Sequence, residues 1–374
     1  MISTSVSPSR ATPSRDGVDL NAVASGLLRD LASIQTSEFK ERGYNGAAAA
    51  VIRLDAPLTA LRQRDRTLRK IAGVGPSSER ILLEVLDTGG SPTVESSVAA
   101  SGKAVDVARR RALREPMLSR ARVLEILRDP SLSGPAPGHY HGDFQMHSEW
   151  SDGALPLLDL VDACIARGYR FSAVADHSHG LPFASGMSLD EMRRQHDEID
   201  RVNALRGGTF RLLKGVEANI LADGSLDLGP GDLTGLEIVL AAPHAKLRGA
   251  EDQTSRLLRA VATPGVHILA HPRGRKLGER AGIVADWPRI FAAAAAHRVA
   301  VELDGDPSRQ DLDAAMARVA LASGCLFALD SDAHSATELV YSETAMAHAR
   351  LAGIPEDRVI NCWTLEQLLD WMPR

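Results

Sequence analysis

The chain of 374 residues contains only three cysteines, and aromatic side chains make up 4% of it. Cys164, Cys325 and Cys362 are odd in number and far apart, which indicates a reducing compartment rather than a disulfide framework. The longest apolar run, Ile290–Ala296, is far too short to cross a bilayer. These absences argue against a disulfide-stabilised scaffold and a membrane protein, and they predict a cytoplasmic location.

Two common catalytic motifs are also missing. The sequence has no G-x-x-x-x-G-K-[S/T] loop for a nucleoside triphosphate and no G-x-S-x-G elbow for a nucleophilic serine. Residues 1–17 are rich in Ser, Pro and Arg and have no apolar core. We therefore expect a disordered tail there, and not a secretory signal.

Charge and histidine are unevenly distributed along the chain. Residues 1–138 contain 20 Lys and Arg against 15 Asp and Glu, whereas the remaining residues contain 23 against 33. All 12 histidines lie at or after His139. The basic first part indicates a polyanionic partner, unless its surface charge has merely drifted. The acidic, histidine-rich remainder indicates cation sites.

A segment rich in proline and glycine, residues 131–138, is expected to be a linker. Before it, residues 18–130 show helical periodicity, as in 20–34, where the apolar side chains share one face. After it, residues 139–374 alternate short apolar runs with helical stretches. The runs are residues 143–146, 171–175, 211–215, 237–241, 267–270, 299–303 and 325–329. Seven such units predict a parallel α/β sheet or barrel with its active site at the carboxyl ends of the strands.

Side chains that bind metals follow almost every predicted strand. They are Gln145, His147, Asp152, His177, Glu217, His244, His271, Asp332 and His334. Any one of these histidines alone is more often structural, but their repetition at converging strand ends indicates a metal centre. Without bound cations, the carboxylates would repel one another or be desolvated without compensation. The other histidines, among them His267 and His348, are expected to be surface or core residues.

Nitrogen and oxygen ligands without a thiolate fit Zn²⁺, Mn²⁺ or Fe²⁺. The number of candidate ligands exceeds what one ion takes, so two or three divalent ions are expected. Clusters of several ions favour the hydrolysis of phosphoesters, because they activate water at neutral pH and neutralise charge on phosphate oxygens.

Six ordered segments carry a specific resemblance: GDFQMHSEWSDG, AVADHS, GVEANILADGSLDL, APHAKL, LAHPRGR and DSDAH. From about Gly142 to near the C-terminus, the chain resembles the polymerase and histidinol phosphatase (PHP) domain. The resemblance is closest to the PHP domain at the C-terminus of bacterial family X DNA polymerases. It implies a distorted (β/α)₇ barrel with a trinuclear metal centre.

The resemblance also implies a division of the ligands among three ions. His147, Glu217 and Asp332 would hold the first ion, with Gln145 beside it. Glu217 would bridge to a second ion, held by His244 and His271. The third ion would be held by Asp152, His177 and His334.

Gln145 stands where many PHP domains have the first histidine of a His-x-His pair. An amide oxygen is a harder and weaker ligand than imidazole, so it should favour Mn²⁺ over Zn²⁺ at the first ion. Alternatively, Gln145 would hydrogen-bond Asp332 or a metal-bound water without touching the ion.

The resemblance further implies that Arg273 and Arg275 meet the phosphate, since a fork of donors suits its oxygens. Surface salt bridges are the alternative role for these arginines. Asp332 or a histidine would handle the proton.

The segment TLRKIAGVGPSSERILLEVL, residues 67–86, resembles a helix-hairpin-helix. Leu68 and Ile71 would end the first helix, and Gly73 and Gly75 would let the hairpin approach a DNA phosphate. Lys70 and Arg80 would add positive charge. A plain helical hairpin is the alternative.

With FKERGYNGAAAA before it, this region resembles the small N-terminal domain of family X polymerases, so the whole would be an all-α helix-hairpin-helix domain followed by the PHP barrel. The lysine used by lyase-active members aligns with Ile81, and the catalytic palm has no counterpart. Neither lyase nor polymerase activity is therefore expected.

These features predict a metal-dependent phosphoesterase acting on DNA ends, of the 3′–5′ exonuclease or 3′-phosphatase type, in DNA repair. DNA 3′ ends or single strands would be its partner, and no membrane is expected. One alternative is a small-molecule phosphatase of the histidinol-phosphate or nucleotide type. The other is a non-catalytic DNA-binding protein with structural metals.

Overall fold

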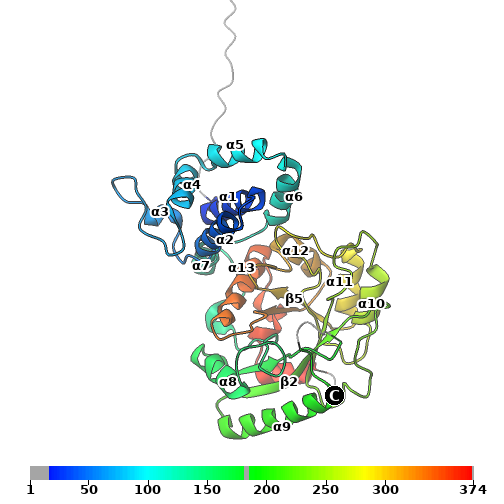
Figure 1. The fold of residues 1–374 in the computed structure, drawn as a ribbon. Helices are drawn as coiled ribbons and strands as arrows, with labels where there is room; N and C mark the ends of the chain where they lie inside the picture. Colours follow the sequence, from blue (N-terminus) through cyan, green and yellow to red (C-terminus); the bar gives the residue numbers. More distant parts are fainter. Residues whose placement is uncertain (1–16, 181–184, 373–374) are drawn as a thin grey trace, which may run out of the picture. The chain divides into compact units, whose positions relative to one another are not determined.

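A computed structural model describes residues 17–180 and 185–372 (Figure 1). The chain divides into two compact units, Met1–Val107 and Ala108–Arg374. Among the helices in the described ranges, none has both the length and the apolar character needed to cross a membrane.

The first unit is helical. Its elements are α1 (Leu20–Ile34), α2 (Glu38–Ile52), α3 (Leu58–Leu61), α4 (Pro76–Thr88), α5 (Pro92–Ala100) and the start of α6 (Ala104–Arg114). Helix α1 begins where the Asp19 carboxylate accepts a hydrogen bond from Ala22 N at 3.0 Å, which satisfies one free N–H of the first turn. Its apolar face packs against α2 and α4, and Leu28, Val51 and Val85 are fully buried between them.

The hairpin differs from its prediction. Leu68 and Ile71 are buried, as helix-packing residues would be, but residues 62–75 form no helix. The Asp65 carboxylate accepts hydrogen bonds from the backbone N–H (3.1 Å) and the hydroxyl (2.7 Å) of Thr67, and this local turn competes with a helix. The second helix of the predicted hairpin is present, since α4 starts directly after Gly75 with Pro76 in its first turn.

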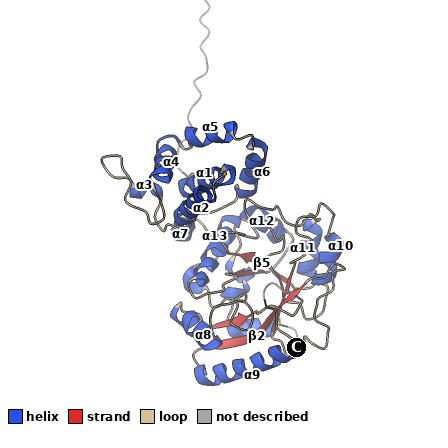
Figure 2. Cartoon of the chain, in the orientation of Figure 1, coloured by secondary structure: helices blue, strands red, loops and turns tan. Residues whose placement is uncertain are grey.

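The second unit is built on a six-stranded parallel sheet whose strands are ordered as in the chain. Figure 2 shows strands of this sheet in red among the helices of the unit. The strands are β1 (Phe171–Val174), β2 (Arg211–Asn219), β3 (Ile238–Ala242), β4 (Ile268–Leu269), β5 (Ala300–Asp304) and β6 (Phe327–Asp330). The main helices of the unit are α7 (Arg120–Arg128), α8 (Leu157–Ala166), α9 (Leu189–Arg206), α10 (Thr254–Val261), α11 (Trp287–Ala296), α12 (Ala314–Ala322), α13 (Ser342–Ala352) and α14 (Leu365–Trp371). The strands are buried along almost their whole length, as expected for a parallel sheet.

The first predicted strand, residues 143–146, is not a regular strand. On one side Ala173 N donates to Asp143 O at 2.9 Å, and on the other His147 N donates to Ala333 O at 2.9 Å. The ladder is interrupted because Phe144 N donates to the side chain of Asp330 (2.9 Å) instead of to a strand carbonyl. The sheet is therefore a curled half-barrel of six strands, which is consistent with the distorted barrel that the sequence predicts.

The border between the units lies before the predicted linker. Helix α7 packs against α13, where Val123 and Ile126 contact Ala347. The guanidinium of Arg350 donates to the carbonyls of Asp129 (2.7 Å) and Leu132 (2.6 Å). Residues 120–132 therefore belong to the second unit, because a buried cation satisfies the carbonyls that follow α7.

His267 and His348 are buried core residues of the second unit, as the sequence suggested. His348 Nδ1 accepts from Ala314 N (3.2 Å), and its Nε2 lies 2.9 Å from Gln310 Oε1. His267 Nδ1 accepts from Val239 N at 3.0 Å. Burial lowers the pKa of His348 to about 3 and the pKa of His267 to about 4, so both rings are neutral at pH 7.

We predict that the second unit loses stability as the pH falls from 6.5 towards 4. In this window the unfolded histidines, with a pKa near 6.5, bind protons that the folded ones do not. Each ring should cost roughly 2 kcal/mol of unfolding free energy at pH 5. His348→Gln removes one ring, so its stability should fall less between pH 7 and pH 5 than that of the wild type.

Urea unfolding followed by tryptophan fluorescence measures this, since all four tryptophans lie in the second unit. Equal pH dependence in the two proteins would show that His348 is not buried as a neutral ring.

Candidate metal centre

The predicted ligands meet at the carboxyl edge of the sheet, because parallel strands all end there. His177 follows β1, Glu217 lies in β2, His244 follows β3, His271 follows β4, and Asp332 and His334 follow β6. His147 and Asp152 come from the irregular segment and the loop before α8. These eight side chains, scattered over 188 positions of sequence, thus form one cluster.

His147, Asp152, His177 and His334 form a first group of possible ligands, with one atom of each lying within 4.8 Å of the others. Asp152 Oδ1 lies 3.3 Å from His334 Nε2, 3.5 Å from His177 Nε2 and 4.0 Å from His147 Nδ1. The rings of His147 and His334 stack with centroids 4.3 Å apart. Three imidazole nitrogens and a carboxylate oxygen suit Zn²⁺ and other borderline divalent ions.

Glu217 is the centre of a second group with His177 and His244. Its Oε2 lies 2.9 Å from His177 Nδ1, and its Oε1 lies 3.2 Å from His244 Nε2 and 2.8 Å from His271 Nε2. Oε2 also lies 3.6 Å from His147 Nε2, in the first group. The fully buried carboxylate of Glu217 therefore faces both groups, as a bridging ligand would.

The grouping differs in part from the implied one. His147 joins Asp152, His177 and His334, although its Nε2 also lies 3.2 Å from Asp332 Oδ1. The described residues form two groups of ligands, and the division into three ions stays a prediction.

Several buried atoms of the cluster indicate that the residues fit bound ions. Within the described ranges, His147 Nδ1, His177 Nδ1 and Glu217 Oε2 have no hydrogen-bond partner. His177 Nδ1 and Glu217 Oε2 are only 2.9 Å apart, but they are not aligned as donor and acceptor. Buried polar atoms are almost always satisfied, and an ion facing these atoms would satisfy them.

Gln145 is fully buried, and neither amide atom has a hydrogen-bond partner among the described residues. The alternative that its side chain bonds directly to Asp332 is therefore not realised. The unpaired amide is compatible with a role at an ion or at a metal-bound water.

The charges of the cluster balance one another. Burial would raise the pKa of Glu217, but His177 and His244 hold it well below its usual range. Burial would likewise raise the pKa of Asp332, but Arg309 and His147 hold it well below its usual range. Burial lowers the pKa of His334, yet the hydrogen bond to Asp152 raises it to about 9. An ion binding to His334 at neutral pH must therefore displace a proton.

The backbone is strained at two of these positions. His271 and Asp332 have φ angles of +24° and +53°, where side chains other than glycine are disfavoured. Each such conformation costs on the order of 1–3 kcal/mol and persists only where its surroundings hold it. At His271 the backbone N–H donates to the buried carboxylate of Glu302, which fixes the turn that presents the imidazole.

The two arginines predicted to hold phosphate make other contacts. Arg275 is buried and pairs with Asp313, and its Nε donates to Arg309 O at 2.8 Å. Arg273 lies 3.3 Å from the same Asp313 carboxylate and donates to Ala281 O at 3.2 Å. Both arginines thus make salt bridges, as in the alternative interpretation, but to a buried carboxylate and not at the surface.

Arg309 is the arginine that reaches the cluster, and sequence reasoning missed it. Its NH2 group lies 3.2 Å from Asp332 Oδ2, and its Nε lies 3.6 Å from Asp304 Oδ2. Burial lowers its pKa, but Asp332, Asp304 and Asp306 outweigh this and raise it. A signal was present, because Arg309 follows the predicted strand at residues 299–303, the one of the seven that supplied no candidate ligand.

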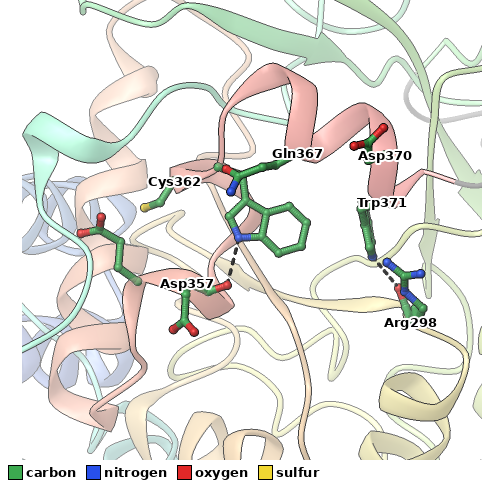
Figure 3. A pocket seen from close by; sticks show the side chains of 8 residues that line it. Arg298, Asp357, Cys362, Gln367, Asp370 and Trp371 are labelled. Carbon is green, nitrogen blue, oxygen red and sulfur yellow. Dashed lines mark hydrogen bonds between the residues drawn. The ribbon is translucent and has the colours of Figure 1, made fainter.

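A cavity of about 560 Å³ lies elsewhere, where Arg298 precedes β5 (Figure 3). It is lined by Arg298, Glu356, Asp357, Cys362, Trp363, Gln367, Asp370 and Trp371. The indole N–H of Trp371 donates to Arg298 O at 3.2 Å. None of the predicted ligands lines this cavity, so it is separate from the metal centre.

Known proteins match this chain over about three-fifths of its length. DNA polymerase/3′-5′ exonuclease PolX of Bacillus subtilis is 35% identical over 238 residues, which are 63% of this chain and 42% of that protein. A probable phosphatase of Enterobacter sp. (strain 638) is 29% identical over 245 residues, covering 62% of this chain and 94% of that protein. The probable phosphatase YcdX of Escherichia fergusonii is 27% identical, covering 59% and 90%.

These matches support a PHP domain. Together with the two groups of possible ligands in this chain, these relatives support a metal-dependent hydrolase. The chain spans less than half the length of PolX. No protein-family model matches the sequence. The crystal structure of histidinol phosphate phosphatase from Lactococcus lactis, complexed with Zn, L-histidinol and phosphate, aligns with a TM-score of 0.43 at 15% identity, covering 55% of this chain and 92% of that one.

We predict about two or three equivalents of Mn, Zn or Fe per chain in gently purified protein, as the number of ligands implies. Glu217→Gln should retain less metal than His271→Gln, because Glu217 faces both groups and His271 contacts only one oxygen. Elemental analysis after dialysis measures retained metal.

Glu251→Gln, at an exposed carboxylate, is the matched control and should retain all the metal. Equal losses in the Glu217 and His271 variants would argue against a bridging carboxylate.

Proposed function

We propose that the second unit is a phosphoesterase that hydrolyses phosphate esters at DNA ends. The observation that carries the proposal is the Glu217 carboxylate facing two groups of histidines, with a guanidinium beside the cluster. When bound, the ions would supply Lewis acidity and an activated water. Such a centre suits phosphoester hydrolysis better than a structural role, which needs closed and fully satisfied ligands.

Arg309 is the residue we propose to hold the phosphate. Its guanidinium is anchored by Asp332 and Asp304, and its side chain is 24% exposed, so part of its donor fork can meet a ligand. A planar fork binds two phosphate oxygens at once and neutralises their charge. Asp332 would remain an ionised ligand, because Arg309 and His147 keep its pKa low.

The DNA partner is proposed on two grounds. The matched relative PolX is named a 3′-5′ exonuclease as well as a polymerase. In the first unit, Lys70, Gly73, Gly75 and Arg80 are exposed, and no described side chain caps the start of α4. Free N–H groups at a helix start bind phosphate, and a Cβ at Gly75 would meet nothing within 4 Å, so this surface is open. The proposed ligand is a DNA 3′ end or a single strand.

A small-molecule phosphatase is the second candidate. It is favoured by the probable phosphatases, which match this chain over nine-tenths or more of their own length. In that case the hairpin would have no role in substrate binding.

Hydrolysis tests the proposal directly. Mn²⁺-loaded protein should release nucleotides or phosphate from DNA 3′ ends faster than it hydrolyses small phosphomonoesters. Arg309→Gln should lower kcat/KM about 100-fold, as loss of a charge-stabilising donor does, and Arg309→Lys should lower it less. Arg318→Gln, at an exposed arginine outside the cluster, should have no effect.

The rates distinguish the candidates. Turnover confined to small esters would establish the second candidate, and no turnover of any ester by metal-loaded protein would leave a non-catalytic DNA-binding protein.

The hairpin has its own test. Gly75→Leu should weaken binding to single-stranded DNA about tenfold, because a bulky side chain blocks backbone contacts with phosphate. Hydrolysis of a small chromogenic ester should be unchanged. The control is Gly43→Leu, since Gly43 is also exposed with no neighbour within 4 Å of its Cβ position. Affinity should also fall with added salt. Equal DNA affinity in both variants would exclude the hairpin as the contact.

A further inference from the structure

A carboxylate outside the ligand groups connects two of the ligand-bearing loops. Asp227, in the turn after β2, accepts hydrogen bonds from Asn219 Nδ2 (2.7 Å), Ser178 Oγ (2.7 Å) and Gly180 N (3.0 Å) on its Oδ2. Its Oδ1 accepts from Asn219 N at 2.9 Å. Ser178 directly follows the ligand His177, so Asp227 fixes the loop after β1.

The same carboxylate acts on His244 through Asn219. Asn219 is 5% exposed, and its Oδ1 lies 2.6 Å from His244 Nδ1. An amide group has one accepting and one donating end, whereas an ionised carboxylate only accepts. Because Asp227 takes the amide's donating end, the accepting end of Asn219 must face His244.

This orientation decides which nitrogen of His244 is available to an ion. An accepting oxygen beside Nδ1 requires a proton on Nδ1, which leaves the lone pair on Nε2. Nε2 is the atom that faces Glu217 Oε1 at 3.2 Å. If the Asn219 amide were reversed, Nδ1 would have to accept and the proton would lie on Nε2, between the ring and the ion.

We propose that Asp227 is a positioning residue of the metal centre, which sets the tautomer of His244 through Asn219 and holds the loop of His177. The inference rests on the metal centre of the proposed function, but not on its substrate. His177 and His244 both belong to the group around Glu217, so one carboxylate controls two of its three members. Outer partners of this kind typically change metal affinity about 10–100-fold.

Gly180 fits this role. A Cβ on this residue would come within 2.2 Å of Asp227 Oδ2 and 3.1 Å of Asn219 Nδ2. Only glycine therefore lets the backbone N–H at this position reach the carboxylate without displacing Asp227.

The test measures metal affinity by competition with a chelator, using Zn²⁺ as the probe and the full chain. Asp227→Asn keeps the shape but gives the Asn219 amide two possible orientations, so Zn²⁺ affinity should fall about tenfold. Asp223→Asn is the matched control, since Asp223 caps a neighbouring exposed turn through Ser225, and its affinity should be unchanged.

The double variant Asn219→Asp with Asp227→Asn restores an accept-only group beside His244 and supplies a donor opposite it. It should recover most of the lost affinity. Unchanged affinity in Asp227→Asn would overturn the proposal, and failure of the double variant to recover any would show that Asp227 acts on the His177 loop alone.

A measurement on the wild type does not depend on any variant folding. In Zn²⁺-loaded protein labelled with ¹⁵N-histidine, His244 should bind through Nε2 and keep its proton on Nδ1. Binding through Nδ1 would overturn the inference. Neither readout involves ester hydrolysis, so a failed proposed function and a failed positioning role give different results.

Discussion

The buried carboxylate of Glu217 is the constraint on which the rest of the second unit depends. An isolated carboxylate with no exposed surface would be neutralised by its surroundings, because burial in a low dielectric disfavours the charged form. Histidines on three sides reverse this effect at Glu217. They can do so only because parallel strands in sequential order bring their carboxyl ends to one edge.

Holding so many polar groups together requires a second layer of interactions. Asp176 accepts from Ser148 N (2.8 Å) and from Gln195 Nε2 (2.5 Å), which fixes the loop between His147 and Asp152. Asp227 does the same for the loops of His177 and His244. Arg309 offsets the charge of Asp332, and the strained turns at His271 and Asp332 aim their side chains. Several ligands are therefore placed by groups outside the two ligand groups.

The two units have different physical characters. The first is a small helical unit with an exposed basic turn before α4, and its apolar core serves packing alone. The second places its polar groups inside the barrel and keeps its apolar clusters around them.

The sequence alone determined which residue types follow each strand, and six of the seven strands and nearly all the candidate ligands could be named from it. Alternation of apolar runs with helices fixes the order of strands, and parallel order fixes where their ends meet. The sequence could not decide that the backbone N–H groups of residues 143–146 bond to side chains rather than form a ladder. Nor could it decide that Arg309, and not Arg273 or Arg275, lies beside the metal ligands. Such outcomes depend on which groups meet in the folded chain, as Phe144 and Asp330 do across 186 positions, because burial and charge select partners that no local pattern specifies. Residues 62–75 show the same limit at short range, because the Asp65 turn lies where the resemblance to a helix-hairpin-helix implied a helix.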